Sequence, residues 1–337
     1  MKKDSGLPEI RALEQRIFDI GSEEEFQQAA WGAFLYQYET NPVYRQFCDL
    51  LKVEPSKVQR LDEVPFLPVE MFKNHRILAG DQTWEKVFHS SGTTGMERSS
   101  HYIHRLDIYR TSLLRAFEQF YGPVRDYCLL ALLPGYADNP DSSLILMVNE
   151  LIREGAHPDS GFFLDDLDSL ADKLRELEER GQKSLLLGVS FALLEMAERY
   201  HLPLKNTIVM ETGGMKGRRA EITREELHHK LMSSFDLKSI HSEYGMAELL
   251  SQAYSNGGGQ FRTPPWMRVW IRDYYDPFHW VPPGKSGGIN IIDLANLHSC
   301  PFIETKDIGK LHPNGSFEVL GRFDYSDIRG CNLLADM

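Results

Sequence analysis

The middle of the chain alternates between apolar runs of strand length and helical patterns. The strand-like runs are 127–134, 183–190, 206–214 and 237–245, and the helical patterns are 142–155, 169–181, 191–200 and 221–235. Strands separated by single helices pair in parallel, so this order predicts an α/β fold with a mostly parallel sheet. Ligands bind such sheets at the carboxyl ends of the strands, and we therefore look for a site in the loops that follow these runs.

The two ends of the chain follow other patterns. Apolar residues spaced by three and four predict helices at 10–20 and 24–39, and Asn41 followed by Pro42 predicts the start of a third. Two prolines within 64–75 predict an extended segment. From Gln260 onward the alternation is typical of antiparallel or mixed strands. We expect a helical section over 1–80 and a main unit over 81–337, packed as one compact body.

Composition excludes some classes of function. The 337 residues carry a net charge of −12, whereas a nucleic-acid-binding surface needs clustered lysine and arginine. No apolar run approaches the length of a membrane span. The first residues are not followed by an apolar stretch of the signal-peptide type, and the four cysteines form no CxxC pair. These features predict a cytoplasmic enzyme or binding protein without structural zinc or disulfides.

The stretch SSGTTG, from Ser90 to Gly95, places two glycines and four hydroxyl side chains in six residues. Backbone N–H groups and hydroxyls concentrated in this way can form a nest around phosphate oxygens. The Gly-Lys-Ser/Thr ending of a Walker loop is missing. Because the same residue types also form surface turns, the stretch alone is compatible with a phosphate loop or with a turn.

Three further segments place charged residues near glycine turns. In HSEYGMAE, Glu243 and Glu248 flank Tyr244; carboxylates suit a hard cation such as Mg²⁺, and an aromatic ring can stack on a base. Asp307 in ETKDIG can accept hydrogen bonds from sugar hydroxyls, and Arg322 in GRFDYSDIRG can bind phosphate or ribose. Each residue also has an ordinary interpretation, as part of a helix start, a turn or a surface ion pair.

The order and spacing of these segments resemble the adenylate-forming superfamily, also called the AMP-binding or acyl-activating superfamily. In that family a Ser/Thr/Gly phosphate loop precedes a glycine-rich adenine loop, a Tyr-Gly-x-Thr/Ala-Glu motif, a Thr-x-Asp and a Gly-Arg-x-Asp. The matching segments are SSGTTG at 90–95, ETGGMKG at 211–217, YGMAE at 244–248, TKD at 305–307 and GRFD at 321–324. The resemblance implies mostly parallel sheets with flanking helices, a smaller mixed β section, and an AMP-binding, acyl-activating domain over 81–337.

The resemblance also implies a role for each matching residue. The ATP phosphates would be held by Ser90, Ser91, Gly92, Thr93, Thr94 and Gly95, and the adenine by Gly213, Gly214, Met215, Tyr244 and Gly245. Glu248 would hold Mg²⁺, Asp307 the ribose hydroxyls, and Arg322 the ribose or the α-phosphate. The implied reaction is attack of a carboxylate on the α-phosphorus of ATP, giving an acyl-adenylate and pyrophosphate. Such a transfer depends on placement and charge neutralisation more than on a protein nucleophile.

The sequence departs from the superfamily pattern at two places. The phosphate loop usually continues Gly-x-Pro-Lys-Gly, whereas here Gly95 is followed by MERS, without a lysine. Arg98, offset by Glu97, and Lys216 are the candidates to supply the missing charge. Most members also have a small mobile domain after Gly-Arg-x-Asp, and this chain extends only 13 residues past Asp324, so we expect that domain to be absent.

Within the superfamily the chain most resembles the LuxE-type acyl-protein synthetases, which are long-chain fatty acid–protein ligases. They combine a helical N-terminal section, SSGTTG, and GR-x-D close to the chain end. Members of that group transfer the acyl group from AMP to their own cysteine and then to a partner acyl reductase. The matching position is Cys331. The charge of nearby Arg329 would favour the thiolate form of Cys331. The ordinary interpretation of such a residue is an inert buried cysteine.

We therefore expect an ATP- and Mg²⁺-dependent acid–thiol ligase that activates a carboxylic acid, in particular a fatty acid. Its partners would be that acid and an acyl reductase or acyl carrier. Two alternatives remain: an acyl-CoA or acyl-carrier ligase, in which Cys331 has no role, and a nucleotide-binding module with impaired catalysis. Cys48, Cys128 and Cys300 are expected to be structural, and neither His89 nor His241 is assigned a proton-transfer role.

Overall fold

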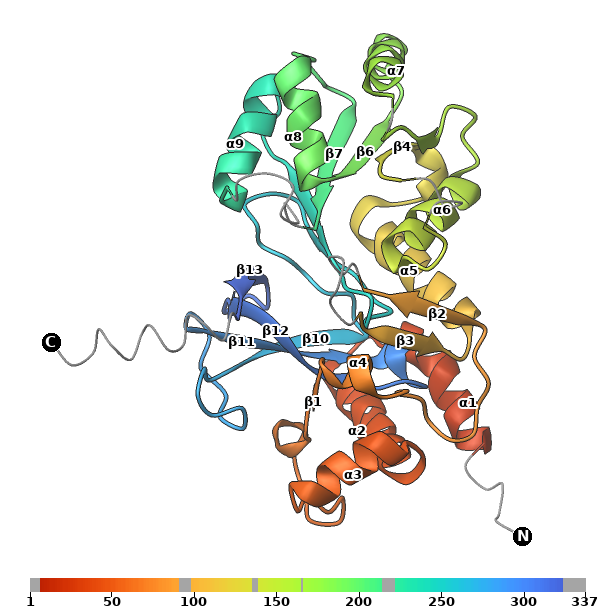
Figure 1. The fold of residues 1–337 in the computed structure, drawn as a ribbon, viewed down its shortest axis with the longest axis vertical. Coiled ribbons are helices and arrows are strands. Elements are labelled where there is room, and N and C mark those ends of the chain that lie inside the picture. Colours follow the sequence, from red (N-terminus) through yellow and green to blue (C-terminus); the bar gives the residue numbers. More distant parts are fainter. Residues whose placement is uncertain (1–6, 91–97, 135–138, 165, 214–221, 324–337) are drawn as a thin grey trace, which may run out of the picture.

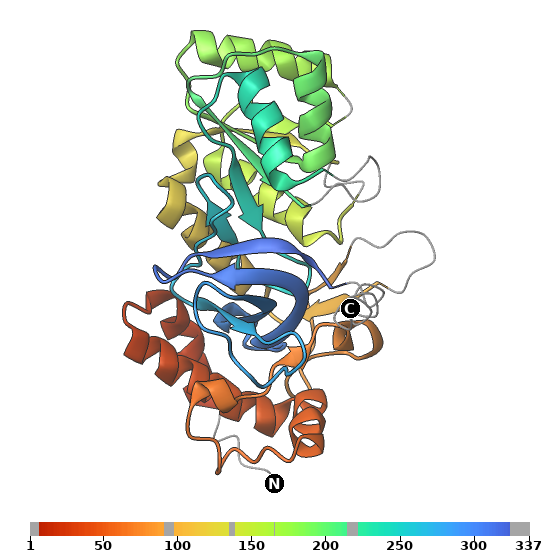
Figure 2. The ribbon, with the colours of Figure 1, turned by 90° about the vertical axis from the view of Figure 1, so that its left-hand side faces the viewer.

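A computed structural model describes residues 7–90, 98–134, 139–164, 166–213 and 222–323. Its strands form a six-stranded sheet, a five-stranded sheet and a two-stranded hairpin. Figure 2 shows the five-stranded sheet in blue between the six-stranded sheet above and the N-terminal helices, in red and orange, below.

The six-stranded sheet confirms the alternation that the sequence predicts. Its strand order is β5-β4-β6-β7-β8-β9, with all neighbours parallel except the antiparallel pair β8 and β9. Every residue of β4 and β6 is buried, as expected for strands covered on both faces. The strands are β4 (Cys128–Leu132), β5 (Gly161–Phe162), β6 (Ser184–Val189), β7 (Thr207–Thr212), β8 (His241–Tyr244) and β9 (Ala253–Ser255).

Helices cover both faces of this sheet. Figure 1 shows α8 and α9 on one side and α5 and α6 on the other. Four of the helices were predicted, whereas α5 was not. The helices are α5 (Leu106–Tyr121), α6 (Ser143–Gly155), α7 (Leu167–Glu179), α8 (Ser190–Arg199) and α9 (Arg224–Phe235), with a 3-10 turn η3 (Val124–Asp126) before β4.

The five-stranded sheet is the mixed β section that the sequence predicts after residue 260. Its strands run in the order β1-β12-β11-β10, and β13 also pairs with β12. All of its pairs are antiparallel except β1 with β12. The strands are β1 (Leu67–Pro68), β10 (Met267–Arg272), β11 (Ser286–Asp293), β12 (Phe302–Leu311) and β13 (Phe317–Arg322), and the 3-10 turn η4 (Leu294–Asn296) follows β11.

The N-terminal section is helical, as predicted. Ser22 caps α2 with a capping box to Glu25. The side chain of Asn41 caps α3, and Pro42 occupies its first turn. The predicted extended segment at 64–75 is extended only at β1 and then turns into the short helix α4. The elements are α1 (Leu7–Arg16), η1 (Ile17–Asp19), α2 (Glu23–Thr40), α3 (Pro42–Leu50), η2 (Leu61–Glu63) and α4 (Met71–Asn74).

The hairpin of β2 (Lys86–His89) and β3 (Ser100–Ile103) lies between the two larger sheets (Figure 1). The SSGTTG stretch begins directly after β2 ends. A phosphate-binding loop in the adenylate-forming pattern would therefore be carried by a two-stranded hairpin and not by a strand of the parallel sheet.

Buried polar contacts attach the N-terminal section to the rest of the chain. Glu14 on α1 lies with one oxygen 2.6 Å from Nε2 of His298 and the other against the guanidinium of Arg105. Burial raises the pKa of Glu14, but the bond to His298 and the charges of His298 and Arg105 lower it more, so the pKa lies below its ordinary value. The division into 1–80 and 81–337 stays a prediction.

A second buried carboxyl group lies in β8. Glu243 accepts a hydrogen bond from the hydroxyl of Thr212 in β7 and faces Tyr254 in β9. Burial raises the pKa of Glu243 to about 7, which the Thr212 bond opposes. A side chain at position 245 would displace the Glu243 carboxyl group, because a Cβ on Gly245 would lie 2.6 Å from Oε1 of Glu243.

Replacing Glu14 by Gln should lower the free energy of unfolding at pH 7.5 by about 1–3 kcal/mol, because a buried ion pair loses its charge. Since the pKa of Glu14 is lowered by folding, this stabilisation exists above the ordinary carboxyl pKa and disappears as pH falls through the folded value. Denaturant unfolding at pH 7.5 and pH 4 measures both effects. Glu195→Gln, in an exposed pair with Arg199, is the control and should cost under about 0.5 kcal/mol. An equal cost for both variants would contradict the interpretation.

Replacing Glu243 by Gln should raise the free energy of unfolding by about 1–3 kcal/mol at pH 8, and most of the gain should disappear near pH 5. The folded pKa of about 7 lies above the ordinary value of 4.5, so the ionised carboxylate destabilises the fold progressively as pH rises between these values. Denaturant unfolding across pH 5–8 measures this. Glu179→Gln, at the exposed end of α7, should give a flat difference. A pH-independent gain for Glu243→Gln would refute the burial argument.

Candidate active site

The base of the β2–β3 hairpin is closed by bonds among the residues that flank the SSGTTG loop. The backbone N–H of Ser90 donates to the carbonyl of Ser99 at 3.2 Å, and the N–H of Ser99 donates to Oγ of Ser90 at 2.9 Å. Nε of Arg98 donates to the carbonyl of Ser90 at 2.6 Å. The side chain of Arg98 therefore lies at the mouth of the loop. The other predicted loop residues, Ser91, Gly92, Thr93, Thr94 and Gly95, lie outside the described residues.

The predicted adenine loop begins at the carboxyl end of β7. Gly213 follows that strand with a φ of 66°, a conformation that favours glycine, and its carbonyl accepts a hydrogen bond of 2.6 Å from Oγ of Ser190. The preceding Thr212 is paired with Glu243 of β8, which places the ends of these two parallel strands side by side. Gly214, Met215 and Lys216 lie outside the described residues.

Glu211, one residue before the end of β7, joins the two sheets. Its Oε1 lies 3.1 Å from Nε of Arg224 on α9, and a nitrogen of the same guanidinium donates to the carbonyl of Val319 in β13 at 3.0 Å. The bond to His228 and the charge of Arg224 hold the pKa of Glu211 below its ordinary value against the desolvation that raises it. The end of β7, where the predicted adenine loop begins, is thus fixed relative to β13.

Tyr244, Asp307 and Arg322 form one bonded cluster. The hydroxyl of Tyr244, at the end of β8, donates to Oδ2 of Asp307 in β12 at 2.7 Å. Oδ1 of the same carboxylate lies 3.0 Å from Nε of Arg322, which faces Asp307 across the β12–β13 pair. The structure therefore brings together three predicted site residues that lie on strands of two different sheets.

The ring of Tyr244 is buried, and it packs edge-on against two phenylalanines. Its centroid lies 5.9 Å from that of Phe261 and 5.6 Å from that of Phe317. Burial and the carboxylate of Asp307 raise the pKa of Tyr244 well above its ordinary value, so the hydroxyl remains a donor at neutral pH. Stacking of this ring on an adenine stays a prediction.

Glu248 lies between the hairpin and this cluster. Its side chain is 5% exposed, and burial raises its pKa. A hydrogen bond to Ser99 and the charge of Arg322 lower the pKa, and the charge of Asp307 raises it. Glu248 therefore interacts both with Ser99 at the base of the hairpin and with Asp307 and Arg322 of the Tyr244–Asp307–Arg322 cluster.

The environment of Glu248 fits a metal ion that takes few protein ligands. Within the described ranges no group of three or more His, Cys, Asp or Glu side chains could enclose a metal. Mg²⁺ commonly takes one or two carboxylates and completes its shell with phosphate oxygens and water. A single buried carboxylate whose ionisation is disfavoured would be stabilised by such a cation, so the donor set fits Mg²⁺ carried by a nucleotide and not a dedicated protein cage.

The described cysteines have the structural role that we expect. Cys48, Cys128 and Cys300 are free and buried. Burial raises the pKa of Cys48 to about 12 and of Cys128 to about 11, and it raises that of Cys300 further. Thiols of this kind are poor nucleophiles at neutral pH. Cys331 lies outside the described residues.

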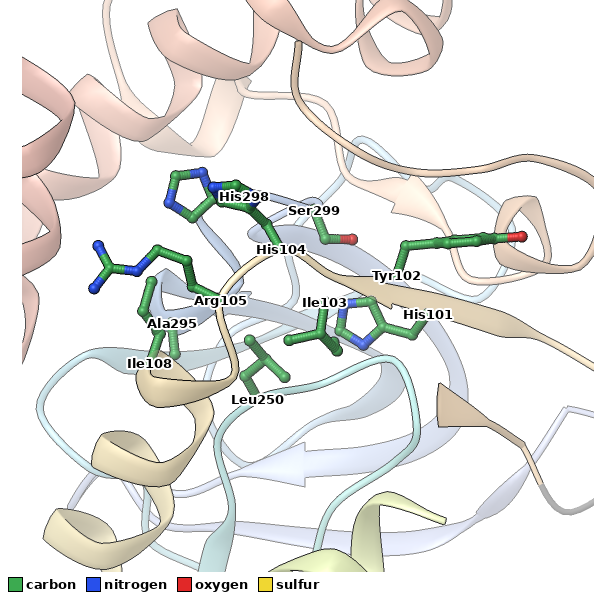
Figure 3. Close-up of a pocket in the computed structure, with 10 residues that line it drawn as sticks. All are labelled: His101, Tyr102, Ile103, His104, Arg105, Ile108, Leu250, Ala295, His298 and Ser299. Atoms are coloured by element: carbon green, nitrogen blue, oxygen red, sulfur yellow. The ribbon is translucent and has the colours of Figure 1, made fainter. Parts of the chain in front are cut away.

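Figure 3 shows a small pocket beside β3. Its lining comes from β3, the start of α5, Leu250 and the turn that contains His298. Its volume of about 10 Å³ holds no more than one water molecule. The pocket marks the junction of the hairpin with the turn after β11.

Sequence reasoning missed three buried side chains near Glu248, namely His101, Asp293 and Asn296. Each bonds to the backbone of residues 247–251. Asp293 carried a signal, since a carboxylate at the end of an apolar strand needs partners. Nothing in the pattern around His101 distinguishes it from the other histidines, of which the chain has 12 in all.

No helix in the part of the chain that the structure describes is long and apolar enough to cross a membrane.

Known proteins resemble this chain in sequence and in fold. A relative from Vibrio harveyi, named long-chain-fatty-acid–luciferin-component ligase, is 26% identical over 328 residues, covering 90% of this chain and 85% of its own. A 2-hydroxyisobutyryl-CoA ligase in complex with 2-HIB-AMP superimposes with a TM-score of 0.63 at 16% identity, covering 92% of this chain and 70% of the other. ATP-bound MatB from Rhodopseudomonas palustris gives 0.54 at 17% identity over 70% of this chain, which spans 47% of the MatB chain.

The solved structures confirm the predicted fold of adenylate-forming ligases. A family model described as acyl-protein synthetase, LuxE, matches residues 13–336. The chain belongs to the LuxE acyl-protein synthetase family, a family of acid–thiol ligases.

Proposed function

We propose that this chain activates a long-chain fatty acid with ATP as an acyl-adenylate and then transfers the acyl group to its own Cys331. The observation that carries the proposal is the Tyr244–Asp307–Arg322 cluster next to the buried carboxyl group of Glu248, in a member of the LuxE family. The name of the Vibrio harveyi relative supports a long-chain acid as substrate.

In the first step, a carboxylate oxygen of the acid attacks the α-phosphorus of ATP. The bond from that phosphorus to the bridging oxygen breaks, and pyrophosphate leaves with the electron pair. The residues of this chain hold the two reactants in line and offset the charge that develops on the phosphates. Mg²⁺ held at Glu248 would supply part of that positive charge.

Asp307 and Arg322 divide the binding of the nucleotide between them. The side chain of Asp307 is 9% exposed, and its carboxylate already accepts the hydroxyl of Tyr244, which leaves acceptor capacity for ribose hydroxyls. The side chain of Arg322 is 68% exposed while its Nε faces Asp307, so its terminal guanidinium N–H groups can meet a phosphate. Arg98 lies at the mouth of the phosphate loop and can replace the lysine that the loop lacks.

In the second step, the sulfur of Cys331 attacks the acyl carbonyl carbon of the adenylate. The thiol proton passes to water, the mixed-anhydride bond breaks, and AMP leaves as the thioester forms. The other three cysteines are buried and have raised thiol pKa values, which disfavours them as acceptors. The thioester would then pass to a partner acyl reductase or an acyl carrier.

Two other outcomes remain distinguishable. A 2-hydroxyisobutyryl-CoA ligase of the same fold was solved with CoA, so free CoA could be the acceptor in place of Cys331. The loop without a lysine favours a third possibility, a nucleotide-binding module without catalysis. ATP–pyrophosphate exchange that depends on added acid would exclude the third possibility, and consumption of CoA identifies the second.

Incubation with ATP, Mg²⁺ and a labelled C14 or C16 fatty acid should yield protein-bound label that hydroxylamine releases. Cys331→Ser should abolish that stable label and leave ATP–pyrophosphate exchange within about threefold of wild type, since adenylation precedes transfer. Cys128→Ser is the matched control and should keep both. Label that persists on Cys331→Ser would refute the acceptor assignment, and intact-protein mass spectrometry locates it.

Replacing Asp307 by Asn should raise the dissociation constant for ATP at least about tenfold, equivalent to about 1.4 kcal/mol, because the charge-assisted bonds to ribose are lost. Tyr244→Phe, which removes only the hydroxyl that orients Asp307, should have a smaller effect of about threefold. Isothermal titration with ATP measures both. Asp172→Asn, on the exposed face of α7, is the control. Unchanged ATP binding by Asp307→Asn would remove this residue from the site.

A further inference from the structure

The segment that carries Glu248 is held in place through its backbone. It connects β8 to β9, and side chains from outside it bond to its main chain on both sides of Glu248. Nδ1 of His101 lies 2.8 Å from the carbonyl of Ala247, and Nδ2 of Asn296 donates to the carbonyl of Glu248 at 2.8 Å. Oδ2 of Asp293 accepts the N–H groups of Leu250 and Ser251 at 2.8 and 3.0 Å.

These three side chains come from different elements. His101 is in β3 of the hairpin, Asp293 ends β11, and Asn296 ends η4. All three residues are fully enclosed, each with an exposed fraction of 0%. Because each bond fixes a main-chain group and not the carboxyl group itself, the three together fix the backbone direction from which the Glu248 side chain leaves.

Asp293 is in turn fixed by a buried network. Its Oδ1 accepts the hydroxyl of Ser251, and that hydroxyl also accepts Nε1–H of Trp266 at 2.9 Å. Nε1 of Trp266 reaches Oγ of Ser112 on α5 at 3.1 Å. Desolvation raises the pKa of Asp293 to about 6, and hydrogen bonds from Ser251, Leu250 and Ala295 oppose it. The anchor at this end of the segment is therefore rigid.

His101 uses only one of its two ring nitrogens. A carbonyl oxygen can only accept, so Nδ1 carries the hydrogen in the bond to Ala247. Burial lowers the pKa of His101 to about 4, which keeps the ring neutral and Nε2 without a hydrogen. Within the described part of the chain, Nε2 has no hydrogen-bond partner, and the ring packs edge-on against Phe72.

Asn296 likewise uses only one of the two polar atoms of its side chain. Its Nδ2 donates to Glu248, whereas Oδ1 has no partner among the described residues. Buried polar atoms without partners are uncommon, because each costs about 1–3 kcal/mol. His101 and Asn296 each carry this cost. It indicates that the main contribution of each side chain is its donated bond, to the carbonyl of residue 247 or of residue 248.

We propose that His101 and Asn296 are positioning residues that aim Glu248 at the metal–nucleotide complex. They act through the backbone and contact neither the metal nor the nucleotide. This inference rests on the proposed function, in which Glu248 holds Mg²⁺ with ATP. It assigns to the hairpin a second role besides carrying the predicted phosphate loop, since β3 would help to set the position of the Glu248 carboxylate.

Substitutions at His101 can distinguish the roles of its two ring nitrogens. The amide nitrogen of asparagine falls close to the position of Nδ1, and that of glutamine falls close to Nε2. His101→Asn should therefore retain the bond to Ala247, whereas His101→Gln and His101→Ala should lose it. A direct role of Nε2 as a ligand predicts the opposite order.

The primary measurement is binding of Mn²⁺, as a paramagnetic substitute for Mg²⁺, to the protein with ATP and without acid, followed by electron paramagnetic resonance. The dissociation constants of the wild type and His101→Asn for Mn²⁺ should agree within about threefold. His101→Gln and His101→Ala should weaken Mn²⁺ binding by about tenfold or more, because each loses one buried hydrogen bond. Amide hydrogen exchange of residues 247–251 should rise in the same two variants. His229→Gln, on the exposed side of α9, should behave as wild type.

Asn296→Leu keeps the shape of the side chain and removes the donor, and it should weaken Mn²⁺ binding to a similar extent, which tests the idea even where a histidine variant fails to fold. Equal Mn²⁺ binding by the Gln and Asn variants of His101, or a wild type that binds no Mn²⁺ with ATP, would overturn the proposal. A wild type that binds Mn²⁺ with the predicted order of variants, but shows no acid-dependent pyrophosphate exchange, would instead refute the proposed function and leave the positioning role standing.

Discussion

The carboxylate of Asp307 takes part in a hydrogen bond that links the two large sheets of this protein. It accepts the hydroxyl of Tyr244 from the parallel sheet and faces the guanidinium of Arg322 from the neighbouring strand of the mixed sheet. Arg224 makes a second bridge, from Glu211 of the parallel sheet to the carbonyl of Val319. A nucleotide bound at Asp307 as proposed would be attached to both sheets at once, and the relative position of the sheets would be part of its binding site.

The site also concentrates buried carboxyl groups. Desolvation raises the pKa of Glu243, Glu248 and Asp293, which lie in β8, in the connection from β8 to β9 and at the end of β11. The hydroxyl of Thr212 partly offsets this cost at Glu243, and the hydroxyl and N–H groups of Ser251 with other backbone N–H groups do so at Asp293. Glu248 has the hydroxyl of Ser99 and the more distant charge of Arg322. The protein neighbours of Glu248 offset only part of the cost of desolvating its carboxylate, and a cation beside it would offset the rest.

The pattern of the sequence was sufficient for the elements that depend on periodicity. The alternation of strands and helices predicted β4, β6, β7 and β8 and their parallel pairing, and Asn41 with Pro42 predicted the start of α3. The helix α5 was missed, although its buried residues Ile108, Leu113 and Phe117 and their neighbours recur at helical spacing. The pattern also could not find His101 or Asn296, because a side chain that bonds to a distant carbonyl leaves no periodic trace. Tyr244, Asp307 and Arg322 were found through their motifs, and only the contacts between the folded strands show that they touch.

The turn of residues 296–299 has contacts on two sides. On one side Asn296 holds the carbonyl of Glu248. On the other, the side chains of Gln37 and Asn41 donate to the carbonyls of Leu297 and Ser299 at 2.7 and 2.9 Å. The N-terminal helices and the connection between β8 and β9 therefore share one short support, and we expect local unfolding of either to be transmitted to the other. We therefore expect the N-terminal helices to unfold together with the segment of Glu248, so that a chain without residues 1–80 would leave that segment with less support.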